Sequence, residues 1–183
     1  TSKPPAEYDP RDYGITLHVG NQNPYGTCWS FASLGALETS YIAQGFGSTA
    51  PDTSELHQAW FVYKDSREGY SYPLNDPSKP TLEQGGNSSK SIAFLSRAGT
   101  ASENDMPYSQ AASIENNPPS RHPEDYPNAI RLKEAYNIGA VNANNREEIK
   151  GLIRQYGAVT FSYEHKHEEL SGDSYYYKTS KGH

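Results

Sequence analysis

The sequence predicts an α+β fold in which helices come first and strands follow. Before residue 100, apolar residues recur at three- to four-residue spacing in three segments, which is the period of packed helices. After residue 130 the pattern changes to short alternating segments around one more helix. This order predicts a helical lobe over about 21–110 and a sheet lobe over about 1–20 and 130–183.

Each predicted helix carries a start or stop signal. Thr27 and Ser54 stand where N-cap residues belong, and Gly45, Gly99 and Gly157 stand where helices end. These signals place the helices at 28–44, 54–64, 88–97 and 145–156. The buried stripe expected on the first helix consists of Trp29, Ala32, Ala36, Leu37 and Tyr41.

The strands are less sharply marked than the helices. Alternation predicts strands at 135–141 and 158–163, with shorter ones at 15–19 and 174–178. Two segments rich in Pro, Gly, Asn and Ser, 66–86 and 100–129, predict irregular connections.

Composition excludes several classes of function. The net charge is −6, which disfavours nucleic acid or an anionic membrane surface as the main partner. No apolar run is long enough to predict a membrane span. The chain has one cysteine, so it has no intrachain disulfide.

That cysteine, Cys28, stands where a turn-rich polar stretch meets the first helix. The N-terminus of a helix carries unpaired N–H groups and a partial positive charge, which favour the thiolate, the nucleophilic form of cysteine. An inert, buried small residue is the ordinary alternative for a lone cysteine. The position of Cys28 favours nucleophilic chemistry instead.

Around Cys28 the sequence resembles the papain-like cysteine peptidases. The resemblance rests on Gln22 six residues before the nucleophile, and on the run Cys28-Trp29-Ser30-Phe31-Ala32 that follows it. Weaker matches follow in the family's order: Asp9-Pro10-Arg11, Ser54-Glu55-Leu56, Gln84-Gly85-Gly86-Asn87 and Met106-Pro107-Tyr108. Tyr25 and Gln84 occupy the places of two cysteines that the family usually pairs. The sequence therefore looks like a bacterial-type member without the usual disulfides, whose loop would be held by packing.

The resemblance implies a two-lobed fold with a helical lobe and a β-barrel lobe. It also implies catalytic roles for three residues. Cys28 would be the nucleophile, His183 the general base and then acid, and Gln22 an oxyanion donor beside the Cys28 backbone N–H. His165 and His167 are alternative histidines; they are expected to belong to a charged loop, and a zinc site is the second reading.

The same resemblance implies a cleft that binds a polypeptide substrate in an extended conformation. Gly85 and Gly86 would approach the substrate backbone closely, because they have no side chain. Asn87 and Ser162, together with Trp29, would line the substrate site. No cofactor and no metal ion are expected.

Measured against the family, 1–183 is expected to be a single peptidase domain that is incomplete at its C-terminal side. The histidine at 183 stands where the family's histidine motif would begin, so a second chain or C-terminal fragment is expected to complete the barrel and supply the triad asparagine. Secretion to the extracellular space is also expected. The rival hypotheses are a catalytically incomplete peptide-binding module and another cysteine–histidine acyl-transfer enzyme.

Overall fold

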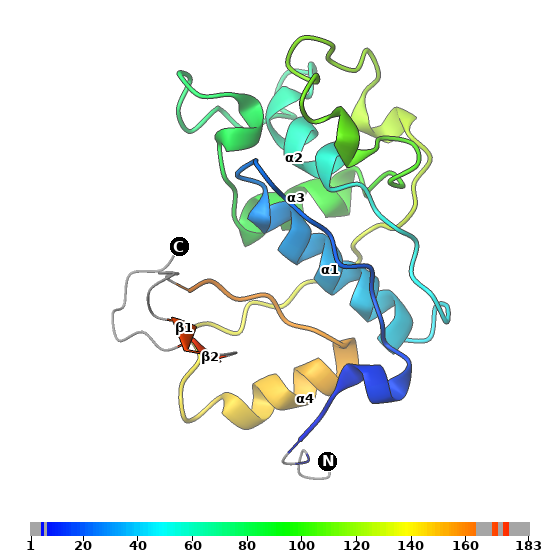
Figure 1. The fold of residues 1–183 in the computed structure, drawn as a ribbon, viewed down its shortest axis with the longest axis vertical. Helices are drawn as coiled ribbons and strands as arrows, with labels where there is room; N and C mark the ends of the chain where they lie inside the picture. Colours follow the sequence, from blue (N-terminus) through cyan, green and yellow to red (C-terminus); the bar gives the residue numbers. More distant parts are fainter. Residues whose placement is uncertain (1–4, 6, 164–169, 172–173, 176–183) are drawn as a thin grey trace.

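The computed structural model describes residues 5, 7–163, 170–171 and 174–175. In this part of the chain the main elements are α1 (Cys28–Ala43), α2 (Glu55–Lys64), α3 (Ser88–Arg97), α4 (Arg146–Tyr156), β1 (Leu170–Ser171) and β2 (Ser174–Tyr175). Short 3-10 helices lie at Pro10–Tyr13, Thr81–Glu83, Tyr108–Gln110 and Pro123–Asp125. Figure 1 shows α2 and α3 towards one end of the molecule and α4 at the other, with α1 between them.

The four predicted helices are confirmed, because their end signals act locally. The Ser54 hydroxyl accepts a hydrogen bond from His57 N at 3.0 Å and caps α2. The Asn87 side chain accepts one from Lys90 N at 3.0 Å and caps α3. Gly157 ends α4 with a positive φ of 85°. Thr27 does precede α1, but its side chain makes no capping bond.

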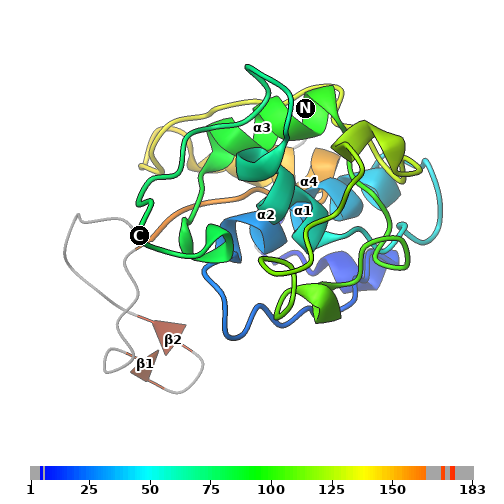
Figure 2. The same ribbon diagram turned by 90° about the horizontal axis from the view of Figure 1, so that it is seen from above.

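The core is built around α2. Every side chain from 56 to 63 is buried, the polar His57 and Gln58 included, so this helix is covered on all sides rather than along one stripe. Helices α1 and α3 both pack against it, as Figure 2 shows from above. The loop residues Leu82, Met106 and Ile114 complete the same cluster. The segment 100–129 is irregular, as predicted, and its buried residues anchor it to α2.

The predicted buried stripe on α1 is correct only in part, because Trp29 and Leu37 are half-buried against the core. The buried residues of this helix are Ser30, Leu34 and Thr39, while Ala32 is exposed. Small polar residues can be buried here because their hydroxyls bond to backbone carbonyls: Ser30 Oγ donates to Glu55 O at 3.0 Å, and Thr39 Oγ1 donates to Gly35 O at 2.6 Å. The hydroxyls allow α1 to pack closely on its neighbours.

Helix α4 contacts the distal half of α1. The end of α4 lies so close that a Cβ on Gly157 would be 2.5 Å from Thr39 Cγ2. None of the α4 side chains is buried, although one face carries the predicted apolar residues. The face of α4 that does not contact α1 is therefore not buried by other described residues.

The predicted strands at 15–19, 135–141 and 158–163 are not strands in the described part of the chain. A strand needs a hydrogen-bonded neighbour, and the described residues form a strand ladder only in the hairpin, where Leu170 pairs with Tyr175 and Ser171 with Ser174. Elsewhere the described residues form two isolated bridges, Thr53 with Ser102 and Thr100 with Ile130. The prediction at 174–178 is confirmed for Ser174–Tyr175, and 176–178 lie outside the described residues. No described helix is long and apolar enough to cross a bilayer.

Candidate active site

Cys28 is the first residue of α1, and its side chain is exposed. The turn before it is closed by two hydrogen bonds: Tyr25 N donates to Gln22 O, and Gln22 Nε2 donates to Tyr25 O, both at 3.0 Å. One amide hydrogen of Gln22 is thereby used inside the loop, which leaves its second hydrogen for another acceptor. The local turn, rather than a distant element, positions the predicted oxyanion donor.

Tyr108, which belongs to a distant segment of the chain, holds the loop from Gln22 to Thr27 in place. Its hydroxyl donates to Gln22 O at 2.8 Å and lies 2.6 Å from Thr27 Oγ1. Because a phenol has one hydrogen, the Thr27 hydroxyl must be the donor in the second bond. The Thr27 hydroxyl is thus bonded to Tyr108 and makes no capping bond with α1. Burial raises the pKa of Tyr108, so the phenol keeps its hydrogen.

The glycine loop 85–87 lies against the residue that follows the nucleophile. A Cβ built on Gly86 would be 2.1 Å from Cδ2 of the Trp29 indole, so only glycine fits there. Gly85 has a φ of +66°, and its carbonyl accepts a hydrogen bond from the Tyr63 hydroxyl at 2.7 Å. The structure therefore brings together Trp29, Gly85 and Gly86, three of the residues predicted to bind substrate.

A hydrogen bond joins the two loops where the family resemblance implied a missing disulfide. Gly26 N donates to Glu83 Oε1 at 3.2 Å. Gln84 instead faces its own loop: Asp76 N donates to its Oε1, and its Nε2 donates to Asp76 O, both at 2.8 Å. The expectation that packing alone holds these loops is therefore incomplete, because a hydrogen bond also joins them.

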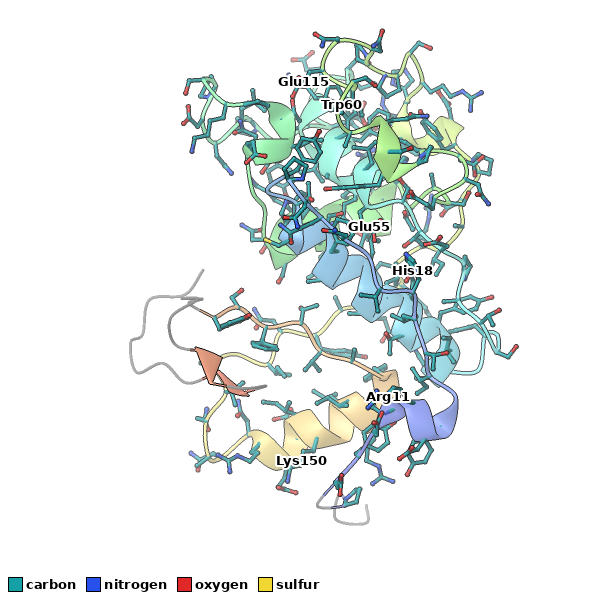
Figure 3. The ribbon with its side chains drawn as sticks, viewed as in Figure 1. Arg11, His18, Glu55, Trp60, Glu115 and Lys150 are labelled. Carbon is teal, nitrogen blue, oxygen red and sulfur yellow. The ribbon has the colours of Figure 1, made fainter. Side chains whose placement is uncertain are left out.

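Glu38, Glu55 and Glu103 carry partly buried carboxyl groups, and the charges of Glu38 and Glu103 act on Glu55. Sequence reasoning did not identify them as a group. Burial and the nearby charges of Glu103 and Glu38 raise the pKa of Glu55 to about 7. The pKa values of Glu38 and Glu103 are also raised, mainly by burial. Glu55 Oε1 lies near Gly20 on the N-terminal segment that also carries His18. Figure 3 labels the side chains of Glu55 and His18.

Among the described residues, the buried histidine is His57 on α2. It is 1% exposed, and its Nε2 lies 3.0 Å from Pro123 O. Burial lowers the pKa of His57 to about 4, so the ring is neutral near pH 7. His57 packs edge-on against Phe61 and Phe94, as a core residue does.

Other predicted site residues are not brought into this arrangement. Asn87 uses its side chain to cap α3. Ser162 is exposed on the segment after α4, and its role stays a prediction. His165, His167 and His183 lie outside the described residues. Among the residues that are described, no group of three or more His, Cys, Asp or Glu side chains is placed to hold a metal ion.

Comparisons with known proteins identify relatives of the chain. No protein-family model matches the sequence. Stem bromelain of Ananas comosus is 49% identical over 37 residues, covering 20% of this chain and 18% of the relative. Cysteine proteinase 1 of Zea mays is 35% identical over 106 residues, covering 57% of this chain and 26% of the relative. The chain thus spans about a quarter or less of these curated relatives.

The solved structures of similar fold cover more of the chain. The clostridial cysteine protease Cwp84 after propeptide cleavage superposes with a TM-score of 0.71 at 27% identity, over 91% of this chain and 37% of that one. A structure of the protease and lectin-like domains of Cwp84 from Clostridium difficile gives 0.65 at 26% identity, over 94% and 36%. The α+β, two-lobed fold with an incomplete barrel lobe is confirmed. In sequence and in fold, the chain is similar to papain-like cysteine peptidases.

Proposed function

We propose that this protein is a cysteine endopeptidase that hydrolyses peptide bonds through a thioester on Cys28. The observation that carries the proposal is the contact between Gly86 and Trp29, which puts the glycine loop beside the exposed nucleophile. A polypeptide paired with the backbone of this loop would run past the start of α1. Strand-like pairing of this kind suits an extended substrate.

The proposed chemistry needs no cofactor. The Cys28 sulfur attacks the scissile carbonyl carbon, and the C–N bond breaks as the amine leaves with a proton from His183. Water then attacks the thioester, which releases the carboxylate and restores the thiol. The free hydrogen of the Gln22 amide and the Cys28 backbone N–H would stabilise the negative oxygen in both steps.

His183 and Ser162 are proposed parts of this site, on the strength of the family resemblance alone. The division into a helical lobe over about 21–110 and a sheet lobe over about 1–20 and 130–183 is also a proposal. Its support is the position of α4 at the opposite end of the molecule from α2 and α3 in Figure 1. Secretion is proposed as well, because a structural relative is titled a surface layer associated protein.

A second candidate function is a catalytically incomplete peptide-binding or interaction module, whose partner would be further polypeptide. Val141 is 66% exposed and Phe161 is 72% exposed, in the same part of the molecule as α4. Such exposed apolar groups favour coverage by other polypeptide. We propose that a second chain or C-terminal fragment covers them, completes the barrel and supplies the triad asparagine.

Cleavage of unfolded casein tests the first function. Wild-type protein, Cys28→Ser and a control variant, Ala32→Ser, would be compared for peptide release. Ala32 is exposed on the same helix, so its change should leave cleavage intact. The proposal predicts release by the wild type and the control but not by Cys28→Ser. Equal release by all three proteins, or none by the wild type, would contradict it.

A further inference from the structure

Behind the glycine loop lies a hydrogen-bonded cluster that begins at a buried lysine. Lys90, on the first turn of α3, is 9% exposed, and Tyr63 on α2 is 5% exposed. Lys90 Nζ donates to the Tyr63 hydroxyl at 2.8 Å and to Asn75 Oδ1 at 3.1 Å. It also lies 4.7 Å from the centre of the Tyr63 ring. No ion pair with a carboxylate involves Lys90 in the part of the chain that the structure describes.

The two partners of Lys90 each reach a carbonyl of the glycine loop. The Tyr63 hydroxyl donates to Gly85 O at 2.7 Å. Asn75 Nδ2 donates to Gln84 O at 2.6 Å and also lies 3.3 Å from the Tyr63 hydroxyl. Two successive carbonyls, Gln84 O and Gly85 O, are thereby bonded to the side chains of Asn75 and Tyr63.

The direction of these bonds follows from the chemistry of lysine. An ammonium group has three donors and no acceptor, so Tyr63 and Asn75 must accept from Lys90. Their own hydrogens are then left for the loop carbonyls. Without Lys90, the Tyr63 hydroxyl could turn and donate to Asn75 Oδ1, and Gly85 O would lose its partner. Burial makes such a lost bond costly.

We propose that Lys90 and Tyr63 are positioning residues that hold the Gly85–Gly86 backbone ready to pair with a polypeptide substrate. The inference rests on the proposed function, because it assigns these residues to the substrate side of the same site. Neither residue touches the reacting atoms. Lys90 sets the direction of the hydrogen bonds, Tyr63 delivers one of them to Gly85 O, and Gly86 keeps its place against Trp29.

Two alkylating probes of Cys28 separate loop positioning from thiol reactivity. An epoxysuccinyl peptide must pair with the glycine loop before it alkylates the thiol, whereas iodoacetamide needs only the thiolate. We expect Tyr63→Phe to slow inactivation by the peptide about three- to tenfold, the effect of losing one hydrogen bond. Lys90→Met should act in the same direction. Both should leave the iodoacetamide rate within about twofold of wild type.

The matched control is Lys64→Met, which removes an exposed lysine beside Tyr63 on α2. It should change neither rate. Equal losses with both probes in Tyr63→Phe, or no loss with the peptide, would overturn the proposal. Tyr63→Phe removes one oxygen and keeps the ring, so the test does not depend on the stability of Lys90→Met.

A measurement independent of activity keeps this inference separate from the proposed function. One hydrogen of Gly86 points at the Trp29 indole, because a Cβ in its place would lie 2.1 Å from the ring. The NMR shift of that hydrogen should therefore be displaced upfield by the ring, and Tyr63→Phe should reduce the displacement. An unchanged shift would refute the role of Tyr63. A wild type that ignores the peptide probe but reacts with iodoacetamide would refute the proposed function instead.

Discussion

The substitution Gly86→Ala tests the contact on which the proposed site depends. The new Cβ would lie 2.1 Å from Trp29 Cδ2 and 2.3 Å from Cε2. Carbon atoms in contact prefer about 3.5 Å, so the indole or the loop must move by about 1.4 Å. Overpacking of this kind costs about 1–3 kcal/mol of the free energy of unfolding. Gly86 is not among the glycines with positive φ, so backbone strain adds nothing to the effect.

Urea denaturation and the rate of Cys28 alkylation by an epoxysuccinyl peptide would measure the effect. The control is Gly35→Ala on α1, where a Cβ meets nothing within 4 Å. Alanine should stabilise that helix by up to about 1 kcal/mol, because glycine is a poor helix former. We expect Gly86→Ala to lose stability and to react with the peptide at least about tenfold more slowly. Wild-type stability together with a wild-type rate would refute the reasoning.

Three further predictions concern the loops and the buried titratable groups. Glu83→Ala should lower the free energy of unfolding by about 0.5–1 kcal/mol because Gly26 N loses its acceptor, and Glu83→Gln should restore it, as thermal unfolding of both variants would show. His57 has a pKa of about 4 when folded and about 6.5 when unfolded, so the unfolded state binds its proton first and stability falls as pH drops from about 6.5 to about 4, by up to about 3 kcal/mol. Urea denaturation across that range should show a shallower fall for His57→Phe, and an identical slope would contradict the assignment. The effect of Glu55 on stability has the opposite sign. Its pKa is about 7 in the folded state, so its contribution to the free energy of unfolding is present in acid and is lost as pH rises from about 4.5 through 7. Glu55→Gln should remove that loss, and a variant that still shows it would contradict this assignment.

Helix ends could be predicted from the sequence because their causes are local. Ser54 and Gly157 act on groups within three or four residues, so the order of residue types was enough. The buried face of α1 could not be predicted. Its hydroxyls are satisfied by carbonyls such as Glu55 O, which belong to another helix or to an earlier turn.

Neither the strand positions nor the polar contacts around the glycine loop could be predicted from the sequence, and the physical reason is the same. A strand is defined by its partner, and 135–141 and 158–163 have none among the described residues. In the sequence, nothing distinguishes Lys90 from an ordinary surface lysine. Only the fold brings Tyr63 and Asn75 into contact with it. Cys28, Gln22 and the double glycine could be identified early because their residue types and spacing are themselves the signal.

The most direct test of the central claim is the mass of the intact protein before and after treatment with an epoxysuccinyl peptide, followed by peptide mapping. We predict one adduct per chain, located on Cys28 and prevented by prior alkylation with iodoacetamide. Cys28→Ser should gain no mass, while Ala32→Ser should be labelled like the wild type. A folded wild-type protein with a reduced Cys28 that remains unlabelled would contradict the account and favour the peptide-binding module.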